Sequence, residues 1–191
     1  QNLAINSVGA ALNFDLEENK KTVLIIGGSN GSRLINSTIL NNLQLFESLN
    51  IQVLWQCGKI YFEQYKHLNA NTNVRVCAYI DKMNLAYDVA DVIISRAGAS
   101  SISELCIVGK PAIFIPSPNV AEDHQSKNAL SLVKKNAAIM VEEKNINKDF
   151  KNSFMGLINN KELQTDLSRN IKKQAKLNAT KDIVNEIEKL L

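Results

Sequence analysis

Several features of common protein classes are missing from this chain of 191 residues. It has no uninterrupted apolar run near the roughly 20 residues that a membrane-spanning helix needs. Its formal net charge is only +3, so we expect no nucleic acid as a partner. It has two histidines and three widely separated cysteines, a set without metal-ligand spacing, so we expect no bound metal. Cys57, Cys77 and Cys106 lie in or beside apolar runs and are expected to be buried free thiols.

Six short apolar runs are present instead: KTVLIIGG, IQVLWQCG, NVRVCAYI, DVIIS, PAIFIP and AAIMVEE. Segments of helical period separate them, at about 32–47, 60–69, 83–89, 100–108 and 124–135. Strands that alternate with helices form parallel sheets covered by helices on both faces. The sequence therefore predicts an α/β fold, a Rossmann-like doubly wound parallel sheet of about six strands.

The two ends of the chain follow other patterns. Residues 1–20 are weakly patterned, and we expect them to be a linker from an N-terminal domain that this chain lacks. Residues 21–191 are expected to form one domain. From about residue 147 the pattern becomes that of successive helices rich in Lys, Asn and Glu, which predicts a helical C-terminal tail.

Four of the predicted strands are followed by loops that could bind a ligand, because ligands of open parallel sheets bind at the carboxyl ends of the strands. The first loop, GGSNGSR at 27–33, has the glycine spacing of neither a dinucleotide fingerprint nor a P-loop, and it could simply be a tight turn for helix packing. The second, YIDKMN at 79–84, could present its main chain to the edge of a flat ring. Asp81 could equally cap a helix there.

The third loop, RAGASS at 96–101, precedes the predicted helix over 100–108. Its small side chains leave the unpartnered N–H groups of the helix start open, as a diphosphate site requires. Glu104 lies about one turn further on, where a carboxylate could accept hydrogen bonds from two ribose hydroxyls. Ser101 and Glu104 also fit a capping box, which would be a purely structural role.

The fourth loop, at 116–129, ends in EDHQSKNA. His124, Gln125 and Asn128 would share one face at a helix start, since residues three and four apart are neighbours on a helix. Their directed hydrogen bonds suit carbohydrate hydroxyls, although polar residues also begin many ordinary helices. Four such loops at one sheet edge together favour a pocket for a nucleotide diphosphate that bears a polar group.

These motifs occur in an order and at a spacing that resemble one family. GGSNGSRLIN, YIDKMNLAY, SRAGASSISEL, GKPAIFIPSP and DHQSKNA resemble the C-terminal half of the MurG family of glycosyltransferases, over essentially residues 15–191. The resemblance implies half of a GT-B fold, in which two Rossmann-like domains face a cleft and the C-terminal one binds the sugar nucleotide. It also implies transfer of N-acetylglucosamine from UDP-N-acetylglucosamine to lipid-linked N-acetylmuramyl-pentapeptide in peptidoglycan synthesis, by a peripheral enzyme on the cytoplasmic side of the bacterial membrane.

The resemblance further implies a role for each matching residue. At the nucleoside, the Ile80 backbone would meet uracil with Met83 nearby, and Glu104 would hold the ribose. The remaining donor-binding residues would be Gly98, Ala99, Ser100 and Ser101 at the diphosphate, Ser29 near the diphosphate or sugar, and His124 and Gln125 at the N-acetylglucosamine, with Asn128 supporting the loop. Two positions depart from the family pattern: Asn30 replaces a Gln, and Ser101 stands where Thr is common.

The lipid-linked acceptor, the inner-membrane surface and the general base would belong to the missing N-terminal domain. We therefore assign no catalytic residue in this chain and expect the chain alone to be inactive. No cofactor or tightly bound metal is expected, because the family resembled uses none and the loops carry no DxD-like pair. Two alternatives stay open: a sugar-nucleotide 2-epimerase on the same scaffold, and a nucleotide-sugar binding subunit without its own catalysis.

Overall fold

The computed structural model describes residues 9–189, and its centre is one sheet of six parallel strands in the order β3-β2-β1-β4-β5-β6. The strands are β1 (Thr22–Ile26), β2 (Gln52–Gln56), β3 (Val74–Cys77), β4 (Val92–Ser95), β5 (Ala112–Phe114) and β6 (Ile139–Met140). Each lies in one of the six apolar runs, so the predicted doubly wound parallel sheet is confirmed. The strand order reverses between β1 and β4, and such a switch point is where open α/β sheets bind ligands.

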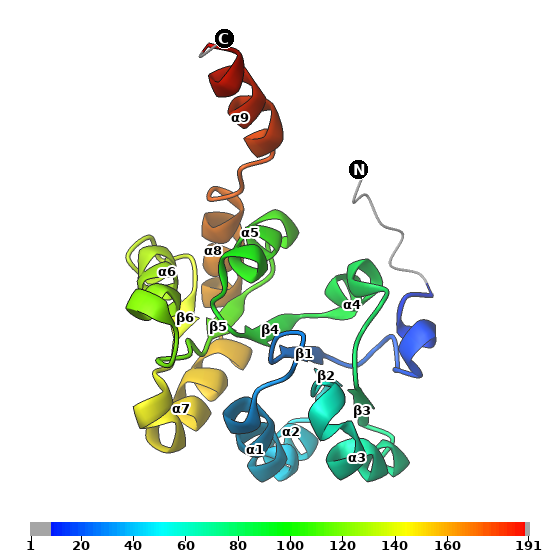
Figure 1. Cartoon of the computed structure of the whole chain (residues 1–191). Helices are drawn as coiled ribbons and strands as arrows, with labels where there is room; N and C mark the ends of the chain where they lie inside the picture. Colours follow the sequence, from blue (N-terminus) through cyan, green and yellow to red (C-terminus); the bar gives the residue numbers. More distant parts are fainter. Residues whose placement is uncertain (1–8, 190–191) are drawn as a thin grey trace.

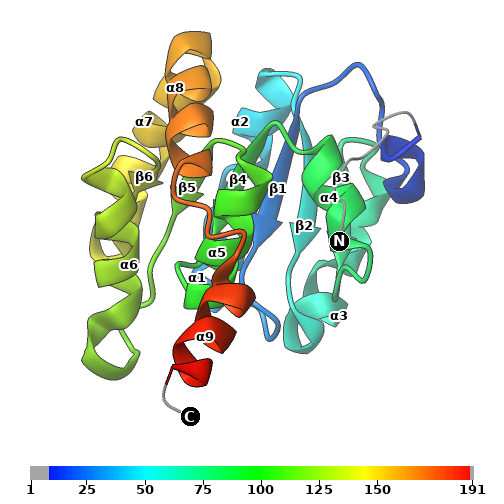
Figure 2. The same cartoon turned by 90° about the horizontal axis from the view of Figure 1, so that it is seen from above.

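Helices cover both faces of this sheet (Figures 1 and 2). One face carries α1 (Arg33–Asn41), α2 (Leu43–Ser48), α3 (Phe62–Tyr65) and α7 (Ile146–Ile158). The other carries α4 (Met83–Val89), α5 (Ala99–Val108), α6 (His124–Val133) and α8 (Lys161–Lys172), and α9 (Ala179–Glu188) projects away from the body. Short 3₁₀ helices complete the chain: η1 (Ala11–Phe14), η2 (Lys59–Tyr61), η3 (Lys66–Ala70), η4 (Ala121–Asp123) and η5 (Glu143–Asn145).

The central strand β1 contributes to two hydrophobic cores, one on each face of the sheet. Val23 and Ile25 belong to the core that includes Phe154 of α7, whereas Leu24 belongs to the core that includes Leu105 of α5. Successive side chains of a strand point to opposite faces, so a strand covered on both sides is apolar at most of its positions. That is why β1 reads as an unbroken apolar run.

Two of the predicted helices have a different form. The segment 32–47 is not one helix but two, because the Asn42 side chain donates a 2.8 Å hydrogen bond to the Thr38 carbonyl where α1 ends. Such side-chain bonds to the backbone compete with helix continuation. The segment 60–69 is mostly 3₁₀ helix on either side of the four-residue α3.

The chain before β1 and the helices α7 and α8 pack against the sheet domain, whereas α9 does not. Of the expected linker, residues 1–8 lie outside the described part, and the rest is held by the Gln52 side chain, whose Nε2 donates a 2.7 Å hydrogen bond to the Glu17 carbonyl. The predicted C-terminal helices are present, but α7 is part of the core, with Phe150 and Phe154 both buried. Within residues 9–189 no helix is long and apolar enough to span a bilayer.

Candidate functional site

A hollow of about 680 Å³ opens at the carboxyl ends of the strands, across the switch point. Its volume is in the range of small-molecule sites in proteins. We call it the carboxyl-edge pocket; its lining includes Ser29, Gln56, Tyr79, Met83, Tyr87, Arg96, Gly98, Ser100, Ser101, Glu104, Gln125 and Glu143. Loops from all four predicted segments therefore meet in one place.

The start of α5 forms one wall of this pocket. Gly98 is the N-cap residue, with extended backbone angles (φ −64°, ψ 152°), and no side chain caps the helix. The first N–H groups of a helix have no partner within it, so those of α5 remain available to an anion. The predicted capping box is wrong, because α5 begins at Ala99 and Ser101 therefore lies inside its first turn.

Glu104 projects from α5 one turn later, and it has a partner that the sequence did not indicate. The Tyr87 hydroxyl on α4 donates a 2.8 Å hydrogen bond to Glu104 Oε2. Burial, and then the neighbouring Glu104 carboxylate, raises the pKa of Tyr87 well above its ordinary value, so the hydroxyl keeps its proton. Glu104 itself is an exposed side chain of the pocket lining.

The loop between β1 and α1 faces the same pocket but is more tightly tied to the fold. Gly31 has a φ of 78°, and a side chain there would overlap the Cys57 carbonyl. Ser32 is the N-cap of α1: its Oγ accepts a 3.3 Å hydrogen bond from the Ile35 N–H and a 2.5 Å bond from the Arg96 guanidinium. The start of α1 is thus capped by a side chain, unlike that of α5.

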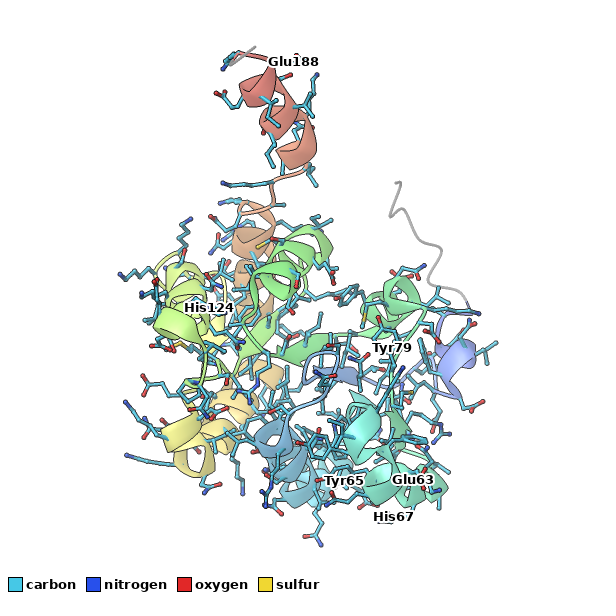
Figure 3. The ribbon with its side chains drawn as sticks, viewed as in Figure 1. Glu63, Tyr65, His67, Tyr79, His124 and Glu188 are labelled. Atoms are coloured by element: carbon cyan, nitrogen blue, oxygen red, sulfur yellow. The ribbon has the colours of Figure 1, made fainter. Side chains whose placement is uncertain are left out.

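The segment after β3 supplies the next wall. Ile80 is 3% exposed, and its N–H donates a 2.9 Å hydrogen bond to Gln56 Oε1, so any contact to a base would go through its carbonyl oxygen. Tyr79 and Met83 line the pocket (Tyr79 is labelled in Figure 3). Asp81 does not cap α4, which begins at Met83 without a side-chain cap.

The start of α6 brings one of its three predicted residues to the pocket lining. Gln125 lines it and accepts a 3.0 Å hydrogen bond from the Ser117 N–H. Asn128 donates a 3.1 Å hydrogen bond to the Ala97 carbonyl, which fixes the β4–α5 loop to α6. His124 is the first residue of α6 (Figure 3). In the described structure the pocket lining includes neither His124 nor Asn128, nor Ala99 or Ile80.

Sequence patterns did not predict three residues of the site: Tyr87, Gln56 and Arg96. Gln56 is 2% exposed and joins two walls, since its Nε2 donates a 3.1 Å hydrogen bond to the Gly28 carbonyl while its Oε1 receives the Ile80 N–H. A polar residue at the end of an apolar strand was the available signal. Arg96 joins Ser32 to Glu143, with 2.5 Å between its Nη1 and Glu143 Oε1.

The cysteines and acidic side chains do not form a metal centre in the described part of the chain, where no three His, Cys, Asp or Glu residues gather. All three cysteines are free; Cys57 and Cys106 are buried as predicted, and Cys77 is partly exposed. Burial raises the pKa of the Cys57 thiol to about 11. It is therefore unreactive as a nucleophile at neutral pH.

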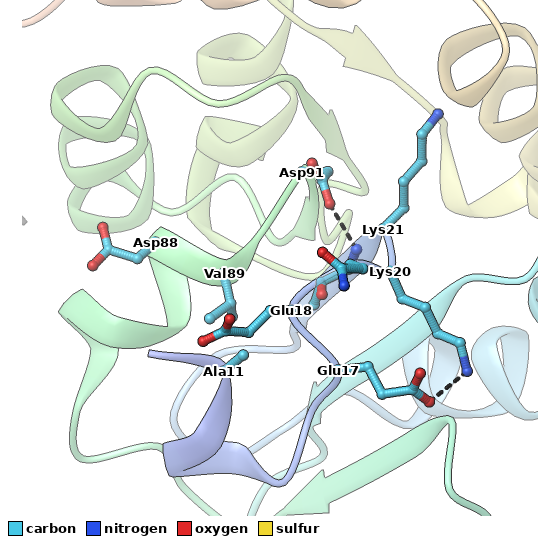
Figure 4. Close-up of a pocket in the computed structure, with 10 residues that line it drawn as sticks. Ala11, Glu17, Glu18, Lys20, Lys21, Asp88, Val89 and Asp91 are labelled. Carbon is cyan, nitrogen blue, oxygen red and sulfur yellow. Dashed lines mark hydrogen bonds and ion pairs between the residues drawn. The ribbon is translucent and has the colours of Figure 1, made fainter. Parts of the chain in front are cut away.

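A second hollow, of about 470 Å³, lies at the amino ends of β1 and β4 (Figure 4). Two of its charged groups are used by the fold: Asp91 Oδ2 accepts a 2.7 Å hydrogen bond from the Thr22 N–H, and Lys20 pairs with Glu17 at 2.6 Å. Asp88 Oδ2, in contrast, is buried without a hydrogen-bond partner among the described residues. We call it the amino-edge hollow and assign it no ligand.

Known proteins resemble this chain over most of its length. The model of the glycosyltransferase family 28 C-terminal domain matches residues 22–187. A relative from Flavobacterium psychrophilum, named UDP-N-acetylglucosamine–N-acetylmuramyl-(pentapeptide) pyrophosphoryl-undecaprenol N-acetylglucosamine transferase, is 56% identical over 178 residues, which are 93% of this chain and 48% of the relative. A relative of the same name from Parabacteroides distasonis is 47% identical over 181 residues, 93% of this chain and 49% of the relative.

Among solved structures, the crystal structure of Acinetobacter baumannii MurG matches with a TM-score of 0.80 and 28% identity, over 98% of this chain and 54% of that one. An NMR structure of ALG13, 17% identical, shows the fold alone, with a TM-score of 0.51 over 71% of this chain and 86% of that one. The chain spans about half the length of the curated relatives it matches.

Proposed function

Because the chain belongs to the glycosyltransferase family 28 C-terminal domain family, we propose that it is the donor-binding half of a transferase that uses UDP-N-acetylglucosamine. The observation that carries the proposal is the uncapped start of α5, which opens into the carboxyl-edge pocket with Glu104 one turn away. The start of α5 could bind an anion, and the Glu104 carboxylate one helical turn further on could accept hydrogen bonds from hydroxyls. These two features match the diphosphate and the ribose of a nucleoside diphosphate. The matched relatives are named as transferases, which favours this function over a 2-epimerase.

The donor would lie across the pocket along the carboxyl edge of the sheet. Its diphosphate would meet the N–H groups and hydroxyls of Ser100 and Ser101, and its ribose hydroxyls would bond to Glu104. The base would lie beside Met83 and the Ile80 carbonyl, an acceptor that suits the N3–H of uracil. The sugar would extend toward Gln125 and His124 at the start of α6, with Ser29 across the pocket.

The proposed reaction is transfer of N-acetylglucosamine to lipid-linked N-acetylmuramyl-pentapeptide. A hydroxyl of the acceptor sugar attacks the anomeric carbon, the bond from that carbon to the β-phosphate oxygen breaks, and UDP leaves. Negative charge then grows on the diphosphate, where the N–H groups of α5 are already oriented to stabilise it. The general base, the acceptor site and the membrane-facing surface belong to the half of the relatives that this chain does not span. We propose that the step needs no tightly bound metal or cofactor.

Calorimetric titration with UDP-N-acetylglucosamine tests this proposal. UDP-glucose, ADP and NAD are titrated in the same way as control ligands. We expect saturable binding that is selective for uridine nucleotides. Binding of ADP or NAD instead, or no saturable binding, would contradict a donor site in this chain.

The Glu104→Ala substitution tests the ribose assignment. It should raise the Kd for UDP about tenfold to a hundredfold, because hydroxyls that bond to a charged acceptor in the complex would lose that acceptor. Glu18→Ala is the matched control, since Glu18 lines the amino-edge hollow and should not affect binding. Unchanged UDP affinity in Glu104→Ala would overturn the ribose assignment.

A further inference from the structure

Side chains from two helices meet in the wall of the carboxyl-edge pocket. Tyr87 on α4 is only 9% exposed and belongs to the core that includes Leu105, so its ring is fixed by packing. Its hydroxyl donates to Glu104 Oε2 at 2.8 Å. Glu104 is an exposed side chain with three rotatable bonds, which would otherwise sample several rotamers. A rigid donor thus holds one oxygen of a mobile carboxylate.

We propose that Tyr87 is a positioning residue that orients Glu104 and thereby sets the preference of this site for ribonucleotides over deoxyribonucleotides. This inference rests on the proposed function, in which Glu104 receives the ribose hydroxyls. Tyr87 acts through Glu104 and needs no contact with the ligand.

The geometry leaves Glu104 enough capacity for both roles. A carboxylate offers about four lone-pair positions, and Tyr87 occupies one of them on Oε2. Oε1 therefore stays open for a hydroxyl. Because Glu104 is held before the ligand arrives, less side-chain entropy is lost when the ligand binds.

A purely structural role for the same hydrogen bond makes a different prediction. If the bond only joined α4 to α5, its loss would weaken the binding of every nucleotide by the same factor. If it orients Glu104, its loss weakens most strongly the ligands that use Glu104. The ratio of UDP to 2′-deoxy-UDP affinity separates the two roles.

The experiment is calorimetric titration of UDP and 2′-deoxy-UDP into the wild-type chain, Tyr87→Phe, Glu104→Ala and the double variant. Tyr65→Phe is the matched control, because Tyr65 is also buried (3% exposed) but packs on Trp55 in the other core. We expect the wild type to prefer UDP by about tenfold or more and Tyr87→Phe by about threefold. Glu104→Ala and the double variant should have no preference, and Tyr65→Phe should keep the wild-type ratio.

The outcomes distinguish this inference from the function on which it rests. A wild-type ratio in Tyr87→Phe, even with both affinities lowered, would overturn the positioning role. A ratio that falls further from Glu104→Ala to the double variant would do the same, because Tyr87 would then act without Glu104. Failure of the wild-type chain to bind any uridine nucleotide would instead overturn the proposed function. Each ratio is measured within one variant, so a loss of folded fraction does not change it.

Discussion

The loops that follow β1 and β4 are both rich in small residues and lie next to each other at the switch point, yet the fold uses them differently. In the β1–α1 loop, Gly31 has a left-handed φ of 78° and faces the Cys57 backbone, and the Ser32 hydroxyl caps α1. In the β4–α5 loop, Gly98 has a φ of −64°, an added Cβ there would meet nothing nearer than Ser101 Oγ at 3.9 Å, and no side chain caps α5.

The difference shows when a loop of small residues is evidence for a ligand. Glycine permits left-handed backbone and close approach of chains, and a hydroxyl at an N-cap satisfies a helix start. At Gly31 and Ser32 these two needs of the fold account for the residue types. At Gly98 and Ser101 neither need is present in the described structure, so the small residues there are free to serve a ligand.

The largest effect that would test this comparison is expected from Gly31→Ala. The alanine side chain would be strained by the left-handed backbone and would overlap the Cys57 carbonyl. Together these effects should lower the free energy of unfolding by about 3 kcal/mol or more. Gly98→Ala is the matched control and should cost at most about 1 kcal/mol, because alanine is a poorer N-cap than glycine but fits the backbone. Urea denaturation measures both, and equal losses would contradict the comparison.

The thiol beneath the β1–α1 loop predicts a dependence of stability on pH. The pKa of Cys57 is about 11 in the folded chain, raised mainly by burial from an ordinary value of 9.0. The unfolded chain therefore releases this proton at lower pH than the folded chain. The contribution is complete below pH 9 and is lost as the pH rises toward 11, by on the order of 2 kcal/mol.

Comparison of the wild type with Cys57→Ser isolates this thiol from the other groups that titrate in the same range. Urea denaturation at pH 8 and pH 10.5 should show a smaller loss of stability in Cys57→Ser, since its hydroxyl does not ionise there. An identical loss in both proteins would show that Cys57 does not ionise on unfolding in this range.

Gly98→Ala should have its main effect on binding. The added methyl group lies at the open start of α5, where the diphosphate must approach the backbone closely, and should raise the Kd for UDP about tenfold. Uridine without phosphates should bind equally to both proteins, which makes it the control ligand. Calorimetry measures both, and an equal loss for uridine would show that the substitution disturbs the base or ribose wall instead.

Local sequence patterns predicted the sheet well because its four central strands are buried on both faces. The runs around Val23 and Ile94, for example, are apolar from Val23 to Ile26 and from Val92 to Ile94, which is typical of buried strands. The break at Asn42 was not predicted, because it depends on which backbone carbonyl the Asn42 side chain reaches. Helical periodicity says nothing about such a choice.

The site was only partly predictable for a related reason. Ser29, Met83, Gly98, Ser101, Glu104 and Gln125 lie in the loops after their strands or near the starts of the helices that follow, so topology brought them to one edge. Tyr87 could not be found this way, since its role comes from a contact between α4 and α5 that neither segment encodes alone. The same holds for Gln56, which joins residues 28 and 80 only because β2 lies beside both β1 and β3.

The smallest effects, and the sharpest contrast, are expected from the two serines at the helix starts. Ser32→Ala should lower the free energy of unfolding by about 1 kcal/mol, because the Ile35 N–H and the Arg96 guanidinium lose their shared acceptor. It should leave UDP affinity within about twofold, since its hydroxyl already has partners in the fold. Ser101→Ala should instead change stability by less than about 0.5 kcal/mol, since its hydroxyl has no hydrogen bond among the described residues, and weaken UDP binding about fivefold. Thermal unfolding measures the stability of the two variants, and calorimetry measures their UDP affinity. A larger loss of stability in Ser101→Ala than in Ser32→Ala would mean that Ser101 at the start of α5 also stabilises the fold.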